Sequence, residues 1–458
     1  MLRLIVSATM LLWLAGTVRA QDKPLRIAVF EVDITPPVGT PLCDGLVPPA
    51  KEIVDPLSAR GIVLLTEDRP IVLCALDWVG IGNSGYDAFR NALAKAAGTT
   101  KDRVAVHCLH QHDAPGCDFE ADEILTRHGL GGKLFDPGFA KKSVDRLAGA
   151  IKKALEKPQT VTHIAVGKAK VDKVASTRRV MGTDGKVKYV RYSSTKDAKI
   201  RAEPQGLIDP YVHLISFWDG DRTIASLTYY ATHPQSYYGK GGVSCDFPGL
   251  ARRLRENENA RPGEVAHIHF NGAGGNVTAG KYNDGSPANR AILANRLATG
   301  MSQAFSSAKT VPIKSADVSW RVVPVALPLS KRYKVKDLEA RVADKKLSDA
   351  ERMKAARNLA WARRCEAGDA IDLSCLHIGP AYVLHMPGEL FVEYQLAAQK
   401  MKPKSPVMMA AYGDYGPGYI GTAIAYTEGG YETGPVSRVG PEVEVVLMRA
   451  MRELLGKQ

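Results

Sequence analysis

Strand-like runs alternate with helix-like segments along most of this chain, and this alternation limits the fold more than any other feature. Residues 25–34 are typical of a strand, and apolar runs at 61–65 and 70–76 flank a short polar turn as a hairpin. A second hairpin is predicted over 212–232, around Asp-Gly-Asp. Because hairpins interrupt the alternation of strands and helices, we expect an α/β fold with a mixed β-sheet core and flanking helices. No internal repeat is visible in the sequence.

The first twenty residues have the pattern of an export signal. Arg3 supplies a positive start, residues 4–15 form an apolar core, and Val18-Arg19-Ala20 forms a small-residue cleavage site. The apolar core is shorter than the ~20 residues that a membrane span needs, and no later stretch is long and apolar enough. We therefore expect residues 1–20 to be removed. Residues 21–458 would then form a single secreted or periplasmic domain without a transmembrane segment.

Charged residues are numerous and widely spread. Residues 331–368 are rich in Lys, Arg, Glu and Ala and predict a solvated helical insertion. The formal net charge of +13 favours anionic partners in general. No recognisable nucleic-acid module occurs, so we expect a solvated basic surface and no nucleic-acid partner. Peripheral contact with a membrane or a cell wall is compatible with this charge.

The seven cysteines are an odd number. Cys74 lies inside an apolar run, which predicts a buried free thiol. Export permits disulfides, and Cys365 with Cys375 or Cys108 with Cys117 are candidate pairs that spacing alone does not establish. No Cys-x-x-Cys occurs, which argues against a thiolate zinc site.

Three histidines lie where the strand predicted at 103–106 gives way to a loop. His107, His110 and His112 precede Pro115-Gly116, which ends regular structure. In an extended strand His110 and His112 would point to the same face, and imidazole is a common zinc ligand. By itself the segment is either a polar loop with satisfied histidines or a metal site.

The same junction of a strand with a turn recurs at two other points. His233 follows the second predicted hairpin, and Glu389 follows the apolar run 381–384 through Pro387-Gly388. Zinc catalysis needs three or four nitrogen or oxygen ligands, and strand ends far apart in sequence can meet in space. Each residue also has a structural interpretation: a strand-terminal polar group for His233, and for Glu389 a helix cap whose charge suits the dipole.

Glycines crowd the segment 272–275, which follows a strand predicted at 265–270. The spacing fits neither a phosphate loop nor a dinucleotide fingerprint, so close approach of the backbone to a ligand is the better explanation. Asn276-Val277-Thr278 matches a glycosylation sequon, but we interpret it as a lining of the site. Five later tyrosines could pack, donate to an oxyanion or bind a metal as phenolate: Tyr412, Tyr415, Tyr419, Tyr426 and Tyr431.

Taken in order, five segments of the chain resemble motifs of the neutral/alkaline, non-lysosomal ceramidases, which are zinc amidohydrolases that cleave the N-acyl bond of ceramide. The family's opening strand is similar to residues 28–36, its His-Thr-His-Ser-Gly-Pro motif to 110–115, its Gly-Asp-Val-Ser-Pro loop to 275–279, its Pro-Gly-Glu motif to 387–389, and its Tyr-rich segment to 414–432. The resemblance covers most of the chain after the export signal. It implies a ceramidase-like catalytic domain.

The resemblance also implies a cofactor. It implies Zn²⁺ held by four side chains: His110, His233, Glu389 and Tyr419. Zinc in such a site lowers the pKa of a bound water to ~7 and polarises the amide carbonyl.

Further residues acquire roles from the same resemblance. His112 would orient the water or protonate the leaving amine, and Tyr431 would stabilise the oxyanion. Thr278 stands where the family carries a serine of its catalytic loop, so its hydroxyl is kept with an added methyl. Arg178 sits about where the family carries a substrate-binding arginine, and Arg179 is a substitute for it.

Two other departures from the family concern the substrate. Asp113 replaces the serine of the histidine motif and adds a negative charge beside the site. The chain also ends near the end of the catalytic domain, without the family's C-terminal β-sandwich. These departures bear on ceramide as the substrate more than on zinc hydrolysis.

We therefore expect an exported, zinc-dependent amidohydrolase that uses a zinc-bound water to cleave an N-acyl amide of a small molecule or lipid, ceramide included. One alternative keeps zinc but acts on another amide or ester, such as an acylated amino sugar. Another is a non-catalytic binding protein on the same fold, because fold does not determine function.

Overall fold

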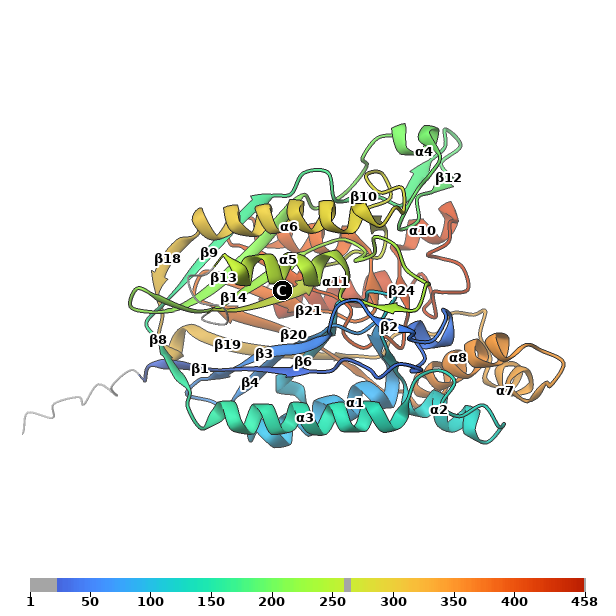
Figure 1. The fold of residues 1–458 in the computed structure, drawn as a ribbon, viewed down its shortest axis with the longest axis horizontal. Coiled ribbons are helices and arrows are strands. Elements are labelled where there is room, and N and C mark those ends of the chain that lie inside the picture. The colour runs from blue at the N-terminus through green and yellow to red at the C-terminus, as the bar shows by residue number, and fades with distance from the viewer. Residues whose placement is uncertain (1–22, 259–264, 457–458) are drawn as a thin grey trace, which may run out of the picture.

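Three large β-sheets with helices on their outer faces make up most of the computed structural model (Figure 1). The model describes residues 23–258 and 265–456, so the predicted export signal at 1–20 lies outside the described residues. None of the helices in this part of the chain combines the length and apolar character that crossing a bilayer requires.

The first sheet contains both parallel and antiparallel strands. Its order is β6 (Val104–Cys108), β4 (Ile71–Leu76), β3 (Ser58–Leu65), β1 (Leu25–Asp33) and β8 (Gln159–Val161). Strands β1, β3 and β4 pair antiparallel, whereas β4 and β6 pair parallel. Helices α1 (Asn83–Ala97) and α3 (Pro137–Leu155) cover its outer face. The hairpin predicted at 61–76 is confirmed.

The second sheet repeats this arrangement. Its order is β16 (Ala266–Asn271), β14 (Arg222–Tyr230), β13 (Tyr211–Asp219), β9 (His163–Lys170) and β18 (Lys309–Pro312). Again three strands, β9, β13 and β14, pair antiparallel, and β14 pairs parallel with β16. Helices α5 (Asp246–Asn257) and α6 (Ala288–Ser306) pack on this sheet.

The third sheet has the same topology once more. Its order is β23 (Val407–Ala410), β21 (Ala381–His385), β20 (Ile371–Ile378) and β19 (Val318–Val325), accompanied by helices α9 (Val392–Met401) and α11 (Val443–Leu454). Strands β19, β20 and β21 pair antiparallel, and β21 pairs parallel with β23. The described chain thus contains three copies of one unit: three antiparallel strands, a helix, a parallel strand and a second helix.

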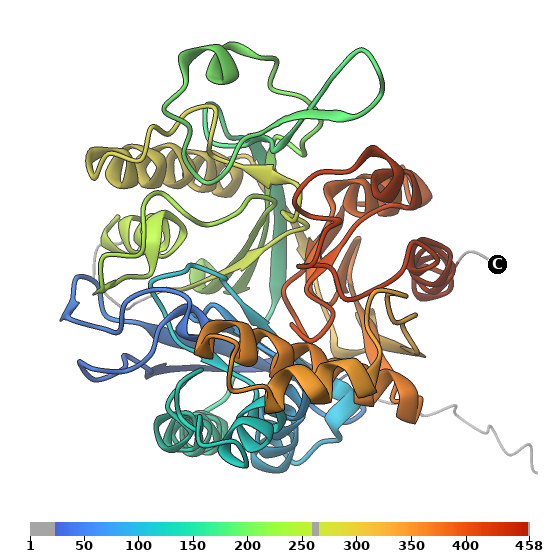
Figure 2. The same cartoon turned by 90° about the vertical axis from the view of Figure 1, so that its right-hand side faces the viewer.

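The inner faces of the three sheets share one apolar core. Ile27 of the first sheet, Ile215 of the second and Leu376 of the third belong to the same buried cluster. Figure 2 shows the three sheets arranged around this common centre. Strands β3, β4 and β6 of the first sheet are buried on both faces, which explains the continuous apolar run of β4. An α/β fold with mixed sheets and flanking helices, as predicted, is confirmed.

A side chain caps the start of α3 but not the start of α1. Asp136 accepts a hydrogen bond from the Phe139 amide and Pro137 occupies the first turn, which begins α3 as capping rules require. Ser84 does not cap α1: that helix begins at Asn83, and the Ser84 hydroxyl instead accepts a hydrogen bond from the Glu120 amide at 2.8 Å.

One connection in each unit, between its first and second strands, is long. These connections are residues 34–57, 171–210 and 326–370. All three lie at the right-hand end of the molecule in Figure 1, the end that faces the viewer in Figure 2. They form the walls of the candidate site described below.

The segment 331–368 forms two helices, α7 (Val335–Ala343) and α8 (Asp349–Ala367). The prediction of helices is therefore confirmed, but the prediction of a solvated segment is wrong for α8. Met353 and Leu359 of α8 belong to the core cluster that includes α1 and α3, and α8 packs against α2 (Phe119–Thr126). Charged residues on α8 alternate with buried apolar ones, so composition alone suggested a solvated face.

All seven cysteines are free thiols in the structure. Neither Cys365 with Cys375 nor Cys108 with Cys117 forms a disulfide. Cys74 is fully buried, as predicted, and burial raises the pKa of its thiol.

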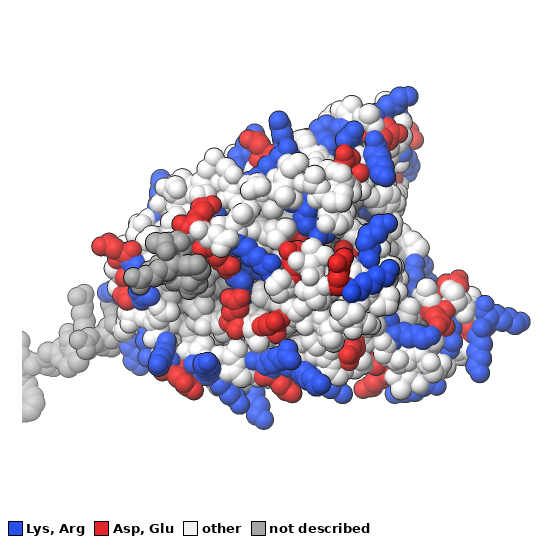
Figure 3. Space-filling model, in the orientation of Figure 1, with Lys and Arg blue, Asp and Glu red and all other residues white. Residues whose placement is uncertain are grey.

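Charged side chains are spread over the surface, as they are along the sequence. On the face drawn in Figure 3, Lys and Arg side chains are scattered, with Asp and Glu among them, and no continuous basic patch forms there. On this face the charges are distributed as on a generally solvated surface.

Candidate metal centre

Three side chains from three different sheets meet at one point. His110, His233 and Glu389 each offer a ligand atom, and these atoms lie within 4.8 Å of one another. Nε2 of His110 is 3.2 Å and Nε2 of His233 is 2.9 Å from Oε2 of Glu389. All three residues are buried. The sequence predicted these three as metal ligands, and the structure places them together.

Each of the three residues follows a strand of its own unit. His110 comes after β6, His233 after β14, and Glu389 after β21. Glu389 begins the short strand β22 (Glu389–Leu390), which pairs parallel with β24 (Tyr419–Ile420) and sets Glu389 beside Tyr419. Strand ends of three sheets that surround a common centre therefore position all four predicted ligands.

His110 reaches the site by a turn and not by strand alternation. Strand β6 ends at Cys108, and His110 has a φ of 69°, in the left-handed region that few residues other than glycine adopt. Its amide is held by the Trp78 carbonyl at 2.9 Å. The rings of His110 and His112 still lie 5.2 Å apart. The predicted proximity of the two imidazoles is thus correct, but the predicted extended strand is wrong.

The imidazole nitrogens are oriented as metal ligands usually are. Nδ1 of His110 lies 2.6 Å from the Val79 carbonyl, and Nδ1 of His233 lies 2.7 Å from the Gly274 carbonyl. A carbonyl can only accept, so each Nδ1 carries a proton, and Nε2 of each ring faces the Glu389 carboxylate. Nε2 of His110 is buried with no hydrogen-bond partner among the described residues. Two imidazole nitrogens and a carboxylate oxygen at these distances offer three ligand atoms to a single cation.

The charge states support this view. Burial raises the pKa of Glu389, but the neighbouring imidazoles of His110 and His233 outweigh it and hold that pKa well below its usual range. Burial, together with the Arg178 guanidinium, lowers the pKa of His233. An ionised carboxylate and two imidazole nitrogens are a donor set that a divalent cation of the zinc type binds.

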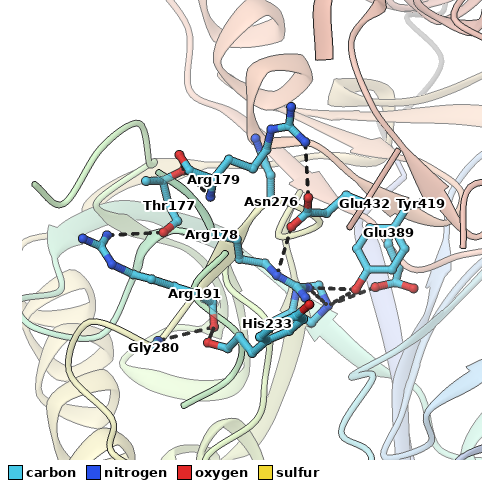
Figure 4. Close-up of polar contacts among 12 residues, drawn as sticks. Thr177, Arg178, Arg179, Arg191, His233, Asn276, Gly280, Glu389, Tyr419 and Glu432 are labelled. Atoms are coloured by element: carbon cyan, nitrogen blue, oxygen red, sulfur yellow. Dashed lines mark hydrogen bonds and ion pairs between the residues drawn. The ribbon is translucent and has the colours of Figure 1, made fainter. Parts of the chain in front are cut away.

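Tyr419 and Arg178 complete the inner face of the site, as Figure 4 shows. The Tyr419 hydroxyl lies 3.0 Å from Nε2 of His233. Nη1 of Arg178 donates to that hydroxyl at 2.8 Å and to Nε2 of His233 at 3.2 Å. Glu432 pairs with Nε of Arg178 at 3.2 Å and anchors the guanidinium.

His112 and three tyrosines form the outer part of the site. Nδ1 of His112 is buried without a hydrogen-bond partner among the described residues, and the Tyr238 ring packs edge-on against the imidazole at 4.6 Å. Tyr431 is 40% exposed and its ring lies 5.7 Å from those of both Tyr419 and Tyr192. The predicted catalytic residues His112 and Tyr431 therefore lie beside the metal ligands.

Thr278 lies in the wall of the site. Its hydroxyl donates to the Tyr192 carbonyl at 2.9 Å, within the 171–210 connection. Among the described residues no hydrogen bond joins it to a predicted ligand. The adjacent Asn276 is buried and hydrogen-bonds to the start of α9 through Val392 and Glu393, which makes it a lining residue and a poor glycosylation acceptor. The catalytic role predicted for Thr278 stays a prediction.

The glycine loop 272–275 approaches backbone, whereas the sequence suggested close approach to a ligand. A Cβ on Gly275 would lie 2.2 Å from the Glu389 carbonyl oxygen, and one on Gly274 would lie 2.7 Å from the Thr232 carbonyl carbon. Both contacts are with the segments that carry metal ligands. The glycines thus allow these two segments to pack together.

Asp113, which replaces a serine in the family's motif, contacts Gly239 and Arg290. Its carboxylate accepts a hydrogen bond from the Gly239 amide at 2.9 Å and lies 4.0 Å from Arg290. Burial raises the pKa of Asp113 to about 6. The added charge is therefore shared with Gly239 and Arg290.

Sequence reasoning missed two neighbours of the ligands. Glu432 pairs with both Arg178 and Arg179, and Arg179 is tied also to Glu428. The guanidinium of Arg179 is thus occupied by ion pairs with the 428–432 segment. Arg179 is therefore no substitute for Arg178 as the predicted substrate-binding arginine. Tyr415 donates to Oε1 of Glu389 at 2.9 Å. Its position among late tyrosines was the only signal in the sequence.

The fold resembles known structures whose sequences have low identity to this chain. No protein-family model matches the chain, and no curated protein sequence matches it. The neutral ceramidase from Pseudomonas aeruginosa superposes with a TM-score of 0.68 and 16% identity, over 95% of this chain and 75% of that one. A ceramidase structure described as complexed with C2 superposes with a TM-score of 0.68 and 16% identity, over 94% and 75%. The chain therefore has the fold of a neutral ceramidase.

Proposed function

We propose that this protein is an exported zinc-dependent amidohydrolase that cleaves an N-acyl amide bond. The observation that carries the proposal is the meeting of His110, His233 and Glu389 at the ends of three sheets, with lone pairs directed at one point. The likeness of the fold to neutral ceramidase supports the same class of reaction. Ceramide or a related lipid amide is the leading substrate.

The donor set fits zinc in its chemistry. Two imidazoles, a carboxylate and the Tyr419 phenol supply nitrogen and oxygen ligands, whereas Mg²⁺ and Ca²⁺ prefer oxygen alone. His110, His233, Glu389 and Tyr419 would hold the ion. Zinc bound there supplies Lewis acidity, which activates a water molecule and polarises an amide carbonyl.

Proton transfer falls to His112. Its unpartnered Nδ1 and its position beside His110 leave it free to accept a proton from the attacking water and to return it to the leaving amine. His112 would thereby serve as the base for the attacking water and as the acid for the leaving amine.

Arg178 and Tyr431 face the substrate. His233 and Tyr419 would hold the ion through Nε2 and the phenol oxygen, the two atoms that accept hydrogen bonds from Nη1 of Arg178 in the structure. That nitrogen then becomes available to bind an oxygen of the substrate, while Glu432 keeps the guanidinium in place. Tyr431, half-exposed at the rim, donates its phenol proton to the developing oxyanion.

The zinc content of purified protein tests the proposal. We expect about one zinc per chain in the wild type and less than a tenth of that in His110→Ala, because three converging donors are needed for tight binding. His128→Ala, which alters an exposed histidine, is the matched control and should keep its zinc. A wild-type protein that binds no zinc at equilibrium would favour the non-catalytic alternative.

The substrate class needs a separate test. Competition between ceramide and an N-acetylated amino-sugar oligosaccharide, followed by release of each carboxylate, compares kcat/KM for the two directly. We expect ceramide to be cleaved faster. Preferential cleavage of the amino sugar would retain zinc hydrolysis and reassign the substrate. Export is tested by the N-terminus of the mature protein, expected at Gln21.

A further inference from the structure

The Glu389 carboxylate presents its two oxygen atoms to different partners. Oε2 faces Nε2 of both His110 and His233, at 3.2 and 2.9 Å. Oε1 accepts a hydrogen bond from the Tyr415 hydroxyl at 2.9 Å. One oxygen is therefore occupied by a protein donor, and only the other is directed at the metal site.

Tyr415 is held in place from several sides. Its amide donates to the Ile81 carbonyl at 2.9 Å, and its ring lies 5.4 Å from that of His110. Gly80 leaves room for the ring, because a Cβ there would lie 2.6 Å from Cδ1 of Tyr415. The side chain is partly buried, and the phenol donates its hydrogen bond to Glu389.

The remaining face of the ring is covered by Arg357 of α8. The Arg357 guanidinium lies over the Tyr415 ring at 5.4 Å, an arrangement that is electrostatically favourable. Arg357 in turn pairs with Asp44 at 2.8 Å, and both side chains of this pair are largely buried. Asp44 lies in the 34–57 connection and Arg357 in the 326–370 connection, so the pair ties two of the long connections together behind the metal site.

Helix α8 also contacts the loop that contains Tyr415, residues 414–416, at two further points. Arg364 pairs with Asp414, the residue before Tyr415, at 2.7 Å. Asn358 accepts a hydrogen bond from Arg438, whose other end donates to the Gly416 carbonyl. The helix that the sequence presented as a solvated insertion thus braces residues 414–416 on both sides of Tyr415.

From these contacts we propose that Tyr415 and Arg357 are positioning residues of the metal centre, which hold Glu389 so that Oε2 alone serves as a ligand oxygen. The inference rests on the proposed zinc site but assigns residues beyond its ligands. A free carboxylate can bind a cation through one or both oxygens. A phenol donor on Oε1 selects the first mode and leaves a coordination position open for water.

Zinc affinity measured by competition with a chromogenic chelator tests the proposal without any substrate. Tyr415→Phe removes only the hydroxyl, and we expect it to weaken zinc binding 10- to 100-fold. Arg357→Met should also weaken zinc binding. Arg357→Lys keeps the charge opposite Asp44 but loses the planar group over the ring. Its zinc affinity should therefore lie between those of the wild type and Arg357→Met.

The matched control is Arg363→Met, on the same helix. Arg363 pairs with Glu339 on the surface, away from the loop, so this variant should bind zinc as the wild type does. Equal zinc affinity in Tyr415→Phe and Arg363→Met would overturn the proposal. If Arg357→Met fails to fold, Tyr415→Phe and Arg357→Lys still decide it, because neither leaves a buried charge without a partner.

Cobalt substitution adds a spectroscopic readout. The d–d absorption of Co²⁺ weakens as the coordination number rises, so a second carboxylate oxygen should lower the band intensity in Tyr415→Phe. An unchanged spectrum in that variant counts against the proposal. Failure of the proposed function is distinguishable, because then the wild type itself would bind neither Zn²⁺ nor Co²⁺.

Discussion

At the scale of single residues, the site depends on polar atoms placed within a few tenths of an ångström. The Nδ1 protons of His110 and His233 are held by the carbonyls of Val79 and Gly274, which determines which nitrogen faces the metal. Residue types and strand ends marked His110, His233 and Glu389 as candidates, and the family resemblance combined them with Tyr419 into one predicted ligand set. The carbonyl partners come from segments that are distant in sequence and carry no identifying side chain, so no sequence pattern could have indicated them.

We expect Tyr431→Phe to keep its zinc and lose rate. Removing one oxyanion donor typically lowers kcat by about 100- to 1,000-fold, while the ligands of the metal are untouched. The measurement is kcat on the best N-acyl substrate together with zinc content. Turnover equal to that of the wild type would exclude Tyr431 as the oxyanion donor.

We also expect Asp118→Asn to change how stability depends on pH. Burial raises the pKa of Asp118 to about 7. Hydrogen bonds from Asn83 and from the Ala121 amide act in the opposite direction and lower this pKa, but burial outweighs them. The folded state therefore holds a proton that the unfolded chain releases near pH 3.8. The stability that this proton contributes is complete below about pH 4 and is lost as pH rises to about 7.

The Asp118→Asn substitution removes that loss, because an amide does not ionise. A shift of about three pKa units corresponds to roughly 4 kcal/mol, so the variant should gain up to about this amount relative to wild type between pH 4 and 8. Asn83 can turn its unpartnered Oδ1 toward the new amide. Urea unfolding at several pH values measures the difference, and parallel curves for the two proteins would contradict the argument.

At the scale of elements, regular segments were predictable where the period of apolar residues was clear. The hairpin of β13 and β14 falls within two residues of its predicted position at 212–232. Strands β19 and β20 were missed because they flank the charged segment 331–368. Polar residues interrupt both strands, so neither makes a continuous apolar run, although β20 is largely buried.

The glycine loop provides a prediction about packing between elements. In Gly275→Ala, the new methyl group would meet the Glu389 carbonyl oxygen at 2.2 Å, and backbone cannot move aside as a side chain can. We expect the shift of β22 to weaken zinc binding at least 10-fold while the protein stays folded. Gly149→Ala, on the exposed side of α3 with no atom near the added Cβ, is the control. Chelator competition compares the two, and equal affinities would show that β22 tolerates the shift.

At the scale of the whole molecule, three copies of one unit enclose a common core and each sends residues to the same end. The second and third units contribute His233 and Glu389 from the segment after their third strand. The first unit carries Asp77 in that segment and supplies its ligand, His110, one strand later. Asp77 pairs instead with Arg252 of the second unit at 2.7 Å.

The Asp77–Arg252 pair joins two units through a fully buried contact. Removing one member leaves an uncompensated buried charge, which typically costs 3–5 kcal/mol. We expect Arg252→Met to lower the free energy of unfolding by about this amount, measured in urea. Arg222→Met, which breaks an exposed pair with Asp219, should change it by less than about 1 kcal/mol. Similar values for both variants would show that the buried pair adds no stability.

The sequence by itself determined the class of fold, the positions of most strands and helices, and the residue types that meet at the candidate metal centre. Apolar period and turn chemistry are local properties, and a ligand must be a side chain that can donate a lone pair. The tertiary structure alone decided the threefold topology, the burial of α8 and the roles of Tyr415 and Arg357. These depend on which surfaces pack against each other, and contacts between segments hundreds of residues apart leave no periodic trace in the chain.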